Sequence, residues 1–337
     1  MTAGKLRWRG TALSVACFVS LFTLCIIITW NRGKTTPTQL RAAVTETRFR
    51  PLTLWEPTFI VLVQTESCLT GHMRSEYAFG NTSTCQCDVL VLSFKRECNE
   101  TLPKHIKYIF KSKTTWNEGR NLLYDVAKSR AKRYLYYIFT DDDINLTTKL
   151  KVNPWIKFLE FLQEIEPAVG VIDKPWQVRD AFDAGKRLGC GTNDISSVDF
   201  INAPNFDSAF NAFHYKAVDH ILPYPTQFDN ESWWWSGFYS KIICDVKFPG
   251  QTVVLTKINV LNPQHRKYPR KLAYDPKDWS EIMESVESRI PEKYHNSKLV
   301  QAWREVGEKN ELKSEGYCFP LPKPHMPIKP FFYLESK

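Results

Sequence analysis

The sequence predicts an α/β fold in which helices flank a mostly parallel β-sheet. Short apolar runs rich in β-branched and aromatic residues, at 59–63, 88–94 and 134–139, have the composition of buried strands. Amphipathic helical patterns follow the capping signals at Thr115 and Asn153. Strands that alternate with helices form βαβ units, whose strands are parallel. These observations together favour the α/β class.

Composition limits the classes of partner that the protein is expected to bind. The chain has 337 residues, 43% hydrophobic and 24% charged, which is typical of a globular protein of one large or two modest domains. Its formal net charge of +9 favours anionic partners. No basic-aromatic module or zinc-finger spacing occurs, so we expect no nucleic-acid partner.

The N-terminus predicts a membrane anchor. Residues 11–30 contain no charged side chain and have the length that crosses a bilayer as a helix. Basic residues precede the run and Trp30 ends it, as expected of a signal anchor with the remaining chain in the lumen. A cleaved signal peptide is the alternative, but the run is long for one and no A-x-A site follows.

The predicted domains follow from that anchor. We expect a cytoplasmic tail at 1–10, the span at 11–30, a stem at 31–56, a catalytic domain at 57–275 and a helical, Pro-rich extension at 276–337. Seven cysteines lie outside the span, which allows at most three internal disulfides, and an interchain bond would link a homodimer. Four N-x-S/T sequons agree with a lumenal domain: Asn81, Asn99, Asn145 and Asn230.

The predicted elements follow in chain order. Strands are expected at 59–63, 88–94, 106–110, 134–139, 168–172, 199–203 and 251–255. Helices are expected after the capping box Thr115/Glu118, after Asn153-Pro154, over 212–222, from the Trp run at 233, and over 277–312.

The strand at 134–139 runs through Thr140 into three carboxylates, Asp141, Asp142 and Asp143. Ligands of open α/β sheets bind at the carboxyl ends of strands. Clustered carboxylates repel one another unless a cation or hydrogen-bond donors offset their charge, and Mg²⁺ or Mn²⁺ would do so. The alternative is a solvated acidic turn without a metal.

Two later segments hold further candidate residues. Asp229 and Glu231 precede three consecutive tryptophans. One of the two carboxylates could be a general base, with the tryptophan faces against a sugar. Alternatively, the carboxylates only provide an acidic start to a helix. His265 is a candidate metal ligand, although a lone His in a basic loop is commonly a surface residue. The basic residues around it are candidate phosphate contacts: Arg266, Lys267 and Arg270.

Taken together, these features resemble the GT-A superfamily of glycosyltransferases in its type II Golgi membrane form. The resemblance covers roughly residues 57–270. It consists of an anchor and stem, the opening strand FIVLVQTE, a helix bearing Gly119-Arg120-Asn121, an apolar strand ending in a D-x-D motif, an acidic-aromatic segment and a late His. It implies a GT-A-like, Rossmann-like sheet and places the protein in the Golgi membrane.

The resemblance also implies roles for single residues. Asp143 would bind Mn²⁺ or Mg²⁺ directly, Asp141 would contact the donor ribose or a metal-bound water, and Asp142 could exchange roles with either. His265 would complete the metal site. Thr65 and Glu66 would line the nucleoside pocket, and Arg120 and Asn121 would hold the nucleotide. Asp229 or Glu231 would be the base for the acceptor hydroxyl.

The implied activity is transfer of a sugar from a nucleotide sugar, a UDP-sugar, to a glycan or glycoprotein acceptor. Inverting and retaining stereochemistry both stay open. The first alternative is an inactive anchored protein that keeps the fold and binds glycans or a partner. A two-metal phosphohydrolase lacks its His/Asp clusters here, and a sulfotransferase lacks its phosphate-binding loop after the first strand.

Overall fold

The structure is a computed structural model of the whole chain. It describes residues 59–101, 103–173, 198–202, 206–262, 269, 275–309, 324–325 and 327–330. The chain divides into two compact units, Met1–Glu56 and Pro57–Lys337. Within the described residues, no helix has both the length and the apolar character needed to cross a membrane. The predicted span at 11–30 lies outside them.

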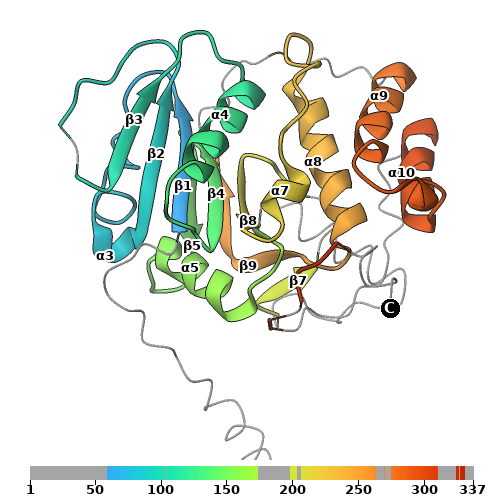
Figure 1. The fold of residues 1–337 in the computed structure, drawn as a ribbon. Coiled ribbons are helices and arrows are strands. Elements are labelled where there is room, and N and C mark those ends of the chain that lie inside the picture. The colour runs from blue at the N-terminus through green and yellow to red at the C-terminus, as the bar shows by residue number, and fades with distance from the viewer. Residues whose placement is uncertain are drawn as a thin grey trace, which may run out of the picture. The chain divides into compact units, whose positions relative to one another are not determined.

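The second unit is a mixed α/β fold (Figure 1). Its strands are β1 (Phe59–Thr65), β2 (Cys87–Ser93), β3 (Ile106–Phe110), β4 (Tyr136–Asp141), β5 (Asn145–Thr148), β6 (Val169–Asp173), β7 (Phe200–Asn202), β8 (Phe210–His214) and β9 (Thr252–Leu261). Its helices are α3 (Thr82–Cys85), α4 (Trp116–Lys128), α5 (Pro154–Ile165), α7 (Val218–Ile221), α8 (Trp233–Lys247), α9 (Pro276–Glu287), α10 (Lys298–Lys309) and the short 3-10 helix η2 (Glu292–Tyr294).

These nine strands form one sheet in the order β3-β2-β1-β4-β8-β6-β9-β5, with β7 also paired to β9. The first four strands in this order, β3, β2, β1 and β4, are parallel to one another. β8 runs antiparallel to both β4 and β6, while β6 and β9 are parallel. β5 and β7 are antiparallel to β9, so six of the nine strands point the same way. The predicted α/β class and mostly parallel strand direction are confirmed at this level.

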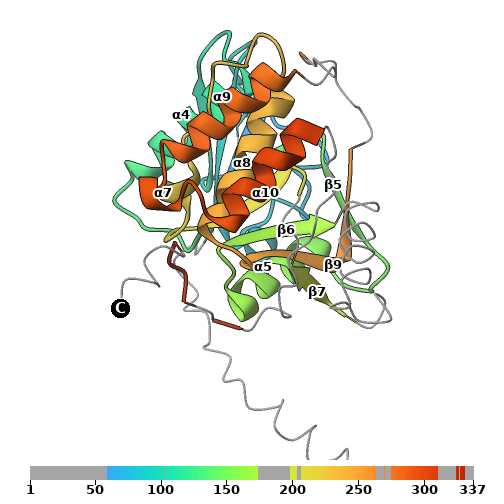
Figure 2. The ribbon, with the colours of Figure 1, turned by 90° about the vertical axis from the view of Figure 1, so that its right-hand side faces the viewer.

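Helices cover both faces of the sheet, as Figures 1 and 2 show. Alternate residues of each strand face opposite sides. Ile60 and Leu62 belong to the core that includes α4, α8 and α9. Phe59, Val61 and Val63 belong to the core that includes α5. The continuous apolar run of β1 therefore reflects burial on both faces.

Two helices begin where the sequence predicts. Thr115 caps α4 and exchanges both hydrogen bonds of a capping box with Glu118. Asn153 caps α5, whose first residue is Pro154. α4 starts just after β3 and ends shortly before β4, so it forms the crossover that carries the chain from β3 to β4, on the other side of β1.

The prediction of a helix over 212–222 is wrong in its first half. Phe210–His214 is β8, which pairs with β4, and only Val218–Ile221 forms the short helix α7. All five β8 residues are buried, so pairing in the centre of the sheet outweighs their weak helical pattern. The predicted strand at 251–255 is the first half of the longer β9, and β5 was not predicted.

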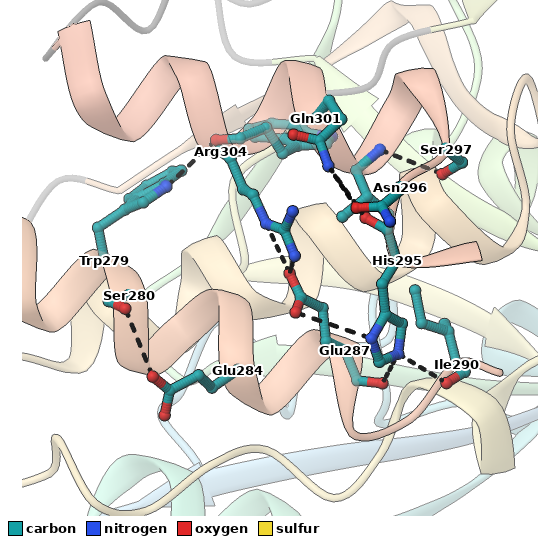
Figure 3. A network of polar contacts seen from close by, with 12 residues as sticks. Trp279, Ser280, Glu284, Glu287, Ile290, His295, Asn296, Ser297, Gln301 and Arg304 are labelled. Atoms are coloured by element: carbon teal, nitrogen blue, oxygen red, sulfur yellow. Dashed lines mark hydrogen bonds and ion pairs between the residues drawn. The ribbon is translucent and has the colours of Figure 1, made fainter. Parts of the chain in front are cut away.

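The C-terminal helices α9 and α10 pack together against the α8 side of the unit. Figure 3 shows Glu287 accepting a hydrogen bond of 2.9 Å from Arg304 Nε, with His295 on its other side. Trp279 Nε1 donates to the Trp303 carbonyl oxygen at 3.1 Å. These contacts confirm two amphipathic helices in the region where one or two were predicted.

Cysteine pairing agrees in part with the prediction of disulfides. Cys68 is bonded to Cys98, and Cys85 to Cys87. Cys244 in α8 is buried and free among the described residues. The bond from Cys68 ties the loop after β1 to the loop after β2, at the carboxyl edge of the sheet.

Candidate functional site

The candidate site lies where the strand order reverses. From β1 the chain proceeds outward to β2 and β3, then crosses back to β4 on the other side of β1. In doubly wound folds, the carboxyl ends of the strands beside such a switch point bind ligands. β1 ends at Thr65 and β4 ends at Asp141, so the predicted nucleoside residues and acid cluster are neighbours.

Asp141 is anchored by two donors. Arg120 Nη2 donates to its Oδ1 at 2.7 Å, and Trp116 Nε1 donates to the same oxygen at 3.0 Å. The Arg120 guanidinium also donates to the Ser208 carbonyl oxygen and lies 3.8 Å from the Trp116 ring centroid. The Asp141 side chain keeps 26% of its surface exposed, whereas Arg120 keeps 2%. Arg120 therefore orients a carboxylate that still faces solvent.

The next two aspartates are buried. Asp142 is 4% exposed and accepts a 2.7 Å hydrogen bond from Thr65 Oγ1, which joins the end of β1 to the end of β4. Thr70 Oγ1 donates to its backbone carbonyl oxygen at 2.9 Å. Asp143 is 5% exposed. The acid cluster is thus built into the sheet edge and differs from a solvated turn.

The first turn of α4 is held against β1. Gln64 Nε2 donates to the Thr115 carbonyl oxygen at 2.9 Å. A Cβ atom at Gly119 would lie 2.3 Å from Gln64 Oε1, so a larger residue here would displace the Gln64 amide. The contact sets the distance between α4 and β1, and hence the reach of Trp116 and Arg120 toward Asp141.

Asp229, one of the two predicted general bases, is buried and hydrogen-bonded. It is 5% exposed, and its two oxygens accept hydrogen bonds from Thr115 Oγ1 and Asn117 Nδ2. Its carbonyl oxygen accepts from Trp233 Nε1 at 3.0 Å. Burial raises the pKa of Asp229, and the bonds from Thr115 and Asn117 oppose that rise. Asp229 therefore ties the start of α4 to the start of α8.

Glu231 lies two residues later and is exposed. Trp234, in the first turn of α8, is 37% exposed and stacks on Phe238 with ring centroids 5.8 Å apart. Of the two carboxylates predicted as the base, Glu231 is therefore the one that solvent reaches. Trp235 is buried, so the Trp run divides between core and surface.

Two predicted nucleotide residues have structural partners. The Asn121 amide donates to the Tyr224 carbonyl oxygen at 2.9 Å and accepts from Tyr224 N at 2.8 Å. Glu66 pairs with Lys95 at 2.6 Å on the surface, and its carbonyl oxygen accepts from Lys95 N and Arg96 N. Their roles toward a nucleotide stay predictions, as does that of Arg120.

The predicted metal ligands lie partly outside the described residues. His265, with Arg266, Lys267 and Arg270, lies outside the described residues. Among the residues described, one group of three His, Cys, Asp or Glu side chains places its ligand atoms within 4.8 Å, namely Cys68, Cys98 and Glu100. Its two sulfurs are bonded to each other, so it is a disulfide beside a carboxylate.

The aspartates after β4 do not converge as three ligands. Mg²⁺ commonly binds through one or two carboxylates, with waters and substrate phosphates completing its shell. Asp141 and Asp143 supply carboxylates of this kind at the sheet edge. Their chemistry therefore fits a cation that arrives with a diphosphate.

Sequence reasoning missed several residues of this edge: Gln64, Trp116, Asp207 and Ser208. Asp207 Oδ1 accepts from Ala209 N at 2.8 Å, and the Ala209 carbonyl oxygen accepts from Asp141 N at 3.0 Å. The segment before β8 thus borders the acid cluster. Assigning β8 as a helix hid this proximity, while the capping box at Thr115 could have drawn attention to Trp116.

Comparisons with known proteins assign no family. No protein-family profile and no curated protein sequence matches the chain. Among solved structures, "Crystal structure of GalNAc-T7 with UDP, GalNAc and Mn2+" aligns with a TM-score of 0.42 and 11% identity, over 77% of this chain and 53% of that chain. "Crystal Structure of A197 from STIV" aligns with a TM-score of 0.34 and 11% identity, over 64% and 95%. At these values neither structure decides the fold or function.

Proposed function

We propose that this protein is a metal-dependent glycosyltransferase that transfers a sugar from a nucleotide sugar, a UDP-sugar, to a glycan or glycoprotein acceptor. The observation that carries the proposal is the position of Asp141–143 at the carboxyl end of β4, bonded through Asp142 to Thr65 at the end of β1. A switch point with carboxylates on one strand end and hydroxyl and backbone groups on the other suits a nucleoside diphosphate with its cation.

Each residue has a proposed part. Asp141 and Asp143 hold Mn²⁺ or Mg²⁺ together with the diphosphate, with His265 as a further ligand. When bound, this cation would offset the negative charge that develops on the departing nucleoside diphosphate. Arg120 and Trp116 fix the orientation of Asp141 through Oδ1 and leave its other oxygen for the ligand.

The acceptor side is assigned to the start of α8. Glu231 is the proposed base for the acceptor hydroxyl, because it is exposed and Asp229 is buried with both oxygens occupied. The exposed face of Trp234 suits stacking against a sugar ring. The GT-A-like fold, the type II Golgi anchor at 11–30 and a homodimer belong to the same proposal.

The test is a donor screen on the full-length protein in mild detergent, made in a secretory host so that its disulfides form. Binding and slow hydrolysis of UDP-sugars and other nucleotide sugars are measured with Mn²⁺ and with EDTA. We expect one donor to bind only with metal, and Asp141→Asn/Asp143→Asn to lose it while staying folded. Asp125→Asn/Asp199→Asn removes two exposed carboxylates elsewhere and should leave binding unchanged.

A folded wild-type protein that ignores every donor in the presence of metal would overturn the proposal. The anchored, inactive binding protein would then be the better interpretation, and the aspartates would be structural groups of the sheet edge.

A further inference from the structure

A basic surface lies at the carboxyl ends of β2 and β3, next to the candidate site. It consists of the exposed side chains of Arg96, Lys111 and Lys113 together with Phe110, which is 42% exposed. We call these four residues the basic edge. None of them has a role in the function proposed above.

Backbone hydrogen bonds hold the basic edge in place. The loop after β2 continues the pairing with β1, since Phe94 N donates to the Thr65 carbonyl oxygen and Arg96 N to that of Glu66, both at 3.1 Å. The loop after β3 continues the pairing with β2. Lys111 N donates to the Ser93 carbonyl oxygen at 3.1 Å and Lys113 N to that of Phe94 at 3.2 Å. The cations therefore project from two loops that are fixed side by side.

The positive charge here is concentrated. Residues 94–113 contain six Lys or Arg and two Glu, a net charge of +4 within a chain whose net charge is +9. Two of the nearby carboxylates already form ion pairs with other cations: Glu66 pairs with Lys95, and Glu100 pairs with Arg74. Two other glutamates close in sequence to these cations, Glu97 and Glu118, are also exposed.

Arg96, Lys111 and Lys113 have no ion-pair partner within the part of the chain that the structure describes. Lys113 also holds a positive φ of 59°, a backbone conformation that lysine seldom adopts. Strained residues of this kind occur where the surrounding structure requires one particular position, as at ligand-binding sites. Three uncompensated cations and one strained backbone position thus coincide at one edge.

We propose that the basic edge binds an anionic glycan chain that carries sulfate or carboxylate groups. Arg96, Lys111 and Lys113 would meet the anionic groups, and the Phe110 face would lie against a sugar ring. Three strand spacings of about 4.8 Å separate β3 from β4, or roughly 14 Å. The basic edge is therefore an accessory surface beside the acid cluster rather than part of it.

The choice of a glycan over other polyanions rests on the proposed function, in which a glycan is the acceptor, and on the exposed ring of Phe110, which directly precedes Lys111 at the end of β3. The test uses full-length protein with and without enzymatic removal of N-glycans, because the Asn99 sequon lies in the same connection between β2 and β3. Binding of a heparin oligosaccharide, hyaluronan, polyphosphate and a single-stranded oligonucleotide is measured over a range of salt concentrations.

The main variant is Arg96→Gln/Lys111→Gln/Lys113→Gln. Its matched control is Lys149→Gln/Lys151→Gln/Lys329→Gln, which removes the same charge from exposed positions elsewhere. We expect the main variant to bind heparin about tenfold more weakly than the wild type, with a shallower salt dependence, and the control to bind normally. Phe110→Ala should weaken binding of heparin and hyaluronan and leave polyphosphate binding unchanged.

Equal losses in the two triple variants would overturn the proposal, because they would trace binding to net charge alone. Tighter binding of the oligonucleotide than of any glycan, or an unchanged Phe110→Ala variant, would overturn the glycan assignment. Metal-dependent donor binding is measured in parallel. Wild-type protein that binds heparin but no donor would contradict the proposed function and leave the basic edge intact.

Discussion

Asp141 and Asp229 are both carboxylates beside aromatic residues, yet the fold uses them differently. Asp141 follows a central strand at the switch point, and two donors share one of its oxygens while a quarter of its side chain stays exposed. Asp229 precedes a helix, is 5% exposed and has a donor on each oxygen. The strand-end position of Asp141 leaves part of its carboxylate available for a ligand, whereas the position of Asp229 between two helix starts makes it a structural link.

The largest effect on stability should come from Arg120→Ala. Removing the guanidinium leaves Asp141 without its buried counter-charge and leaves Asn211 Nδ2 as the donor to the Ser208 carbonyl oxygen. We expect the free energy of unfolding to fall by about 3–5 kcal/mol, measured by urea denaturation. Lys128→Ala removes a salt bridge whose side chains are 53% and 54% exposed, so its loss should be about 0–1 kcal/mol. Equal losses in both variants would contradict the assigned role of Arg120.

A third carboxylate, Asp245 in α8, extends the comparison to a buried residue that accepts a hydrogen bond from Trp303 Nε1 at 2.8 Å. Burial raises the pKa of Asp245 to about 7, against a usual value of 3.8. The folded state then holds the proton more tightly than the unfolded state. Stability from this group is fully present below about pH 4 and is lost as pH rises toward 7.

Asp245→Asn should remove this pH dependence. The variant keeps an acceptor for Trp303 but carries no charge, so its advantage over the wild type should grow between about pH 4 and 7 and level off above. Urea unfolding at half-unit pH intervals checks the result. A difference between the two proteins that does not change with pH would show that Asp245 does not titrate in this range.

Asp229→Ala should cost about 2–3 kcal/mol, because it removes the acceptor of the Thr115 hydroxyl and leaves the buried Asn117 amide with Ser236 Oγ as its acceptor. Glu231→Ala, at an exposed position two residues away, should change stability by less than about 0.5 kcal/mol. Thermal and urea unfolding of the two variants measure these losses of stability. A stable Asp229→Ala protein would return Asp229 to the position of candidate base.

The effect of substituting Gly119 depends on the residue at position 64. Gly119→Ala should cost about 1–2 kcal/mol, since the new methyl group displaces the Gln64 amide from the Thr115 carbonyl oxygen. In a Gln64→Ala protein the same substitution should stabilise by up to about 1 kcal/mol, because alanine favours a helix more than glycine. A double-mutant cycle measures this change of sign, and additive effects would exclude the contact.

Local signals predicted the first half of the fold well. β1 to β4, α4 and α5 carry apolar runs, a capping box and an Asn-Pro start, and each lies within two or three residues of its predicted place. β8 was mistaken because its burial comes from β4, which lies far away in sequence. β5 is half-buried and short, so it carries no apolar run that would identify it.

The same limit applies to the candidate site. A carboxylate cluster after a strand is visible in sequence, and so is its place at the edge of the sheet. Which donors hold each carboxylate is not visible, because those donors come from other elements: Arg120 and Trp116 from α4 for Asp141, and Thr115 and Asn117 for Asp229. Sequence spacing cannot supply these contacts, which span 21 and 25 residues for Asp141 and 114 and 112 residues for Asp229.

The most direct test of the central claim is to count bound Mn²⁺ by electron paramagnetic resonance in the full-length protein with UDP present. The wild type should bind Mn²⁺ in a UDP-dependent way, Asp143→Asn should lose that signal, and Asp229→Asn should keep it. A UDP-dependent Mn²⁺ signal that is unchanged in Asp143→Asn and lost in Asp229→Asn would contradict the account, because it would place the cation at α8 instead of at the end of β4.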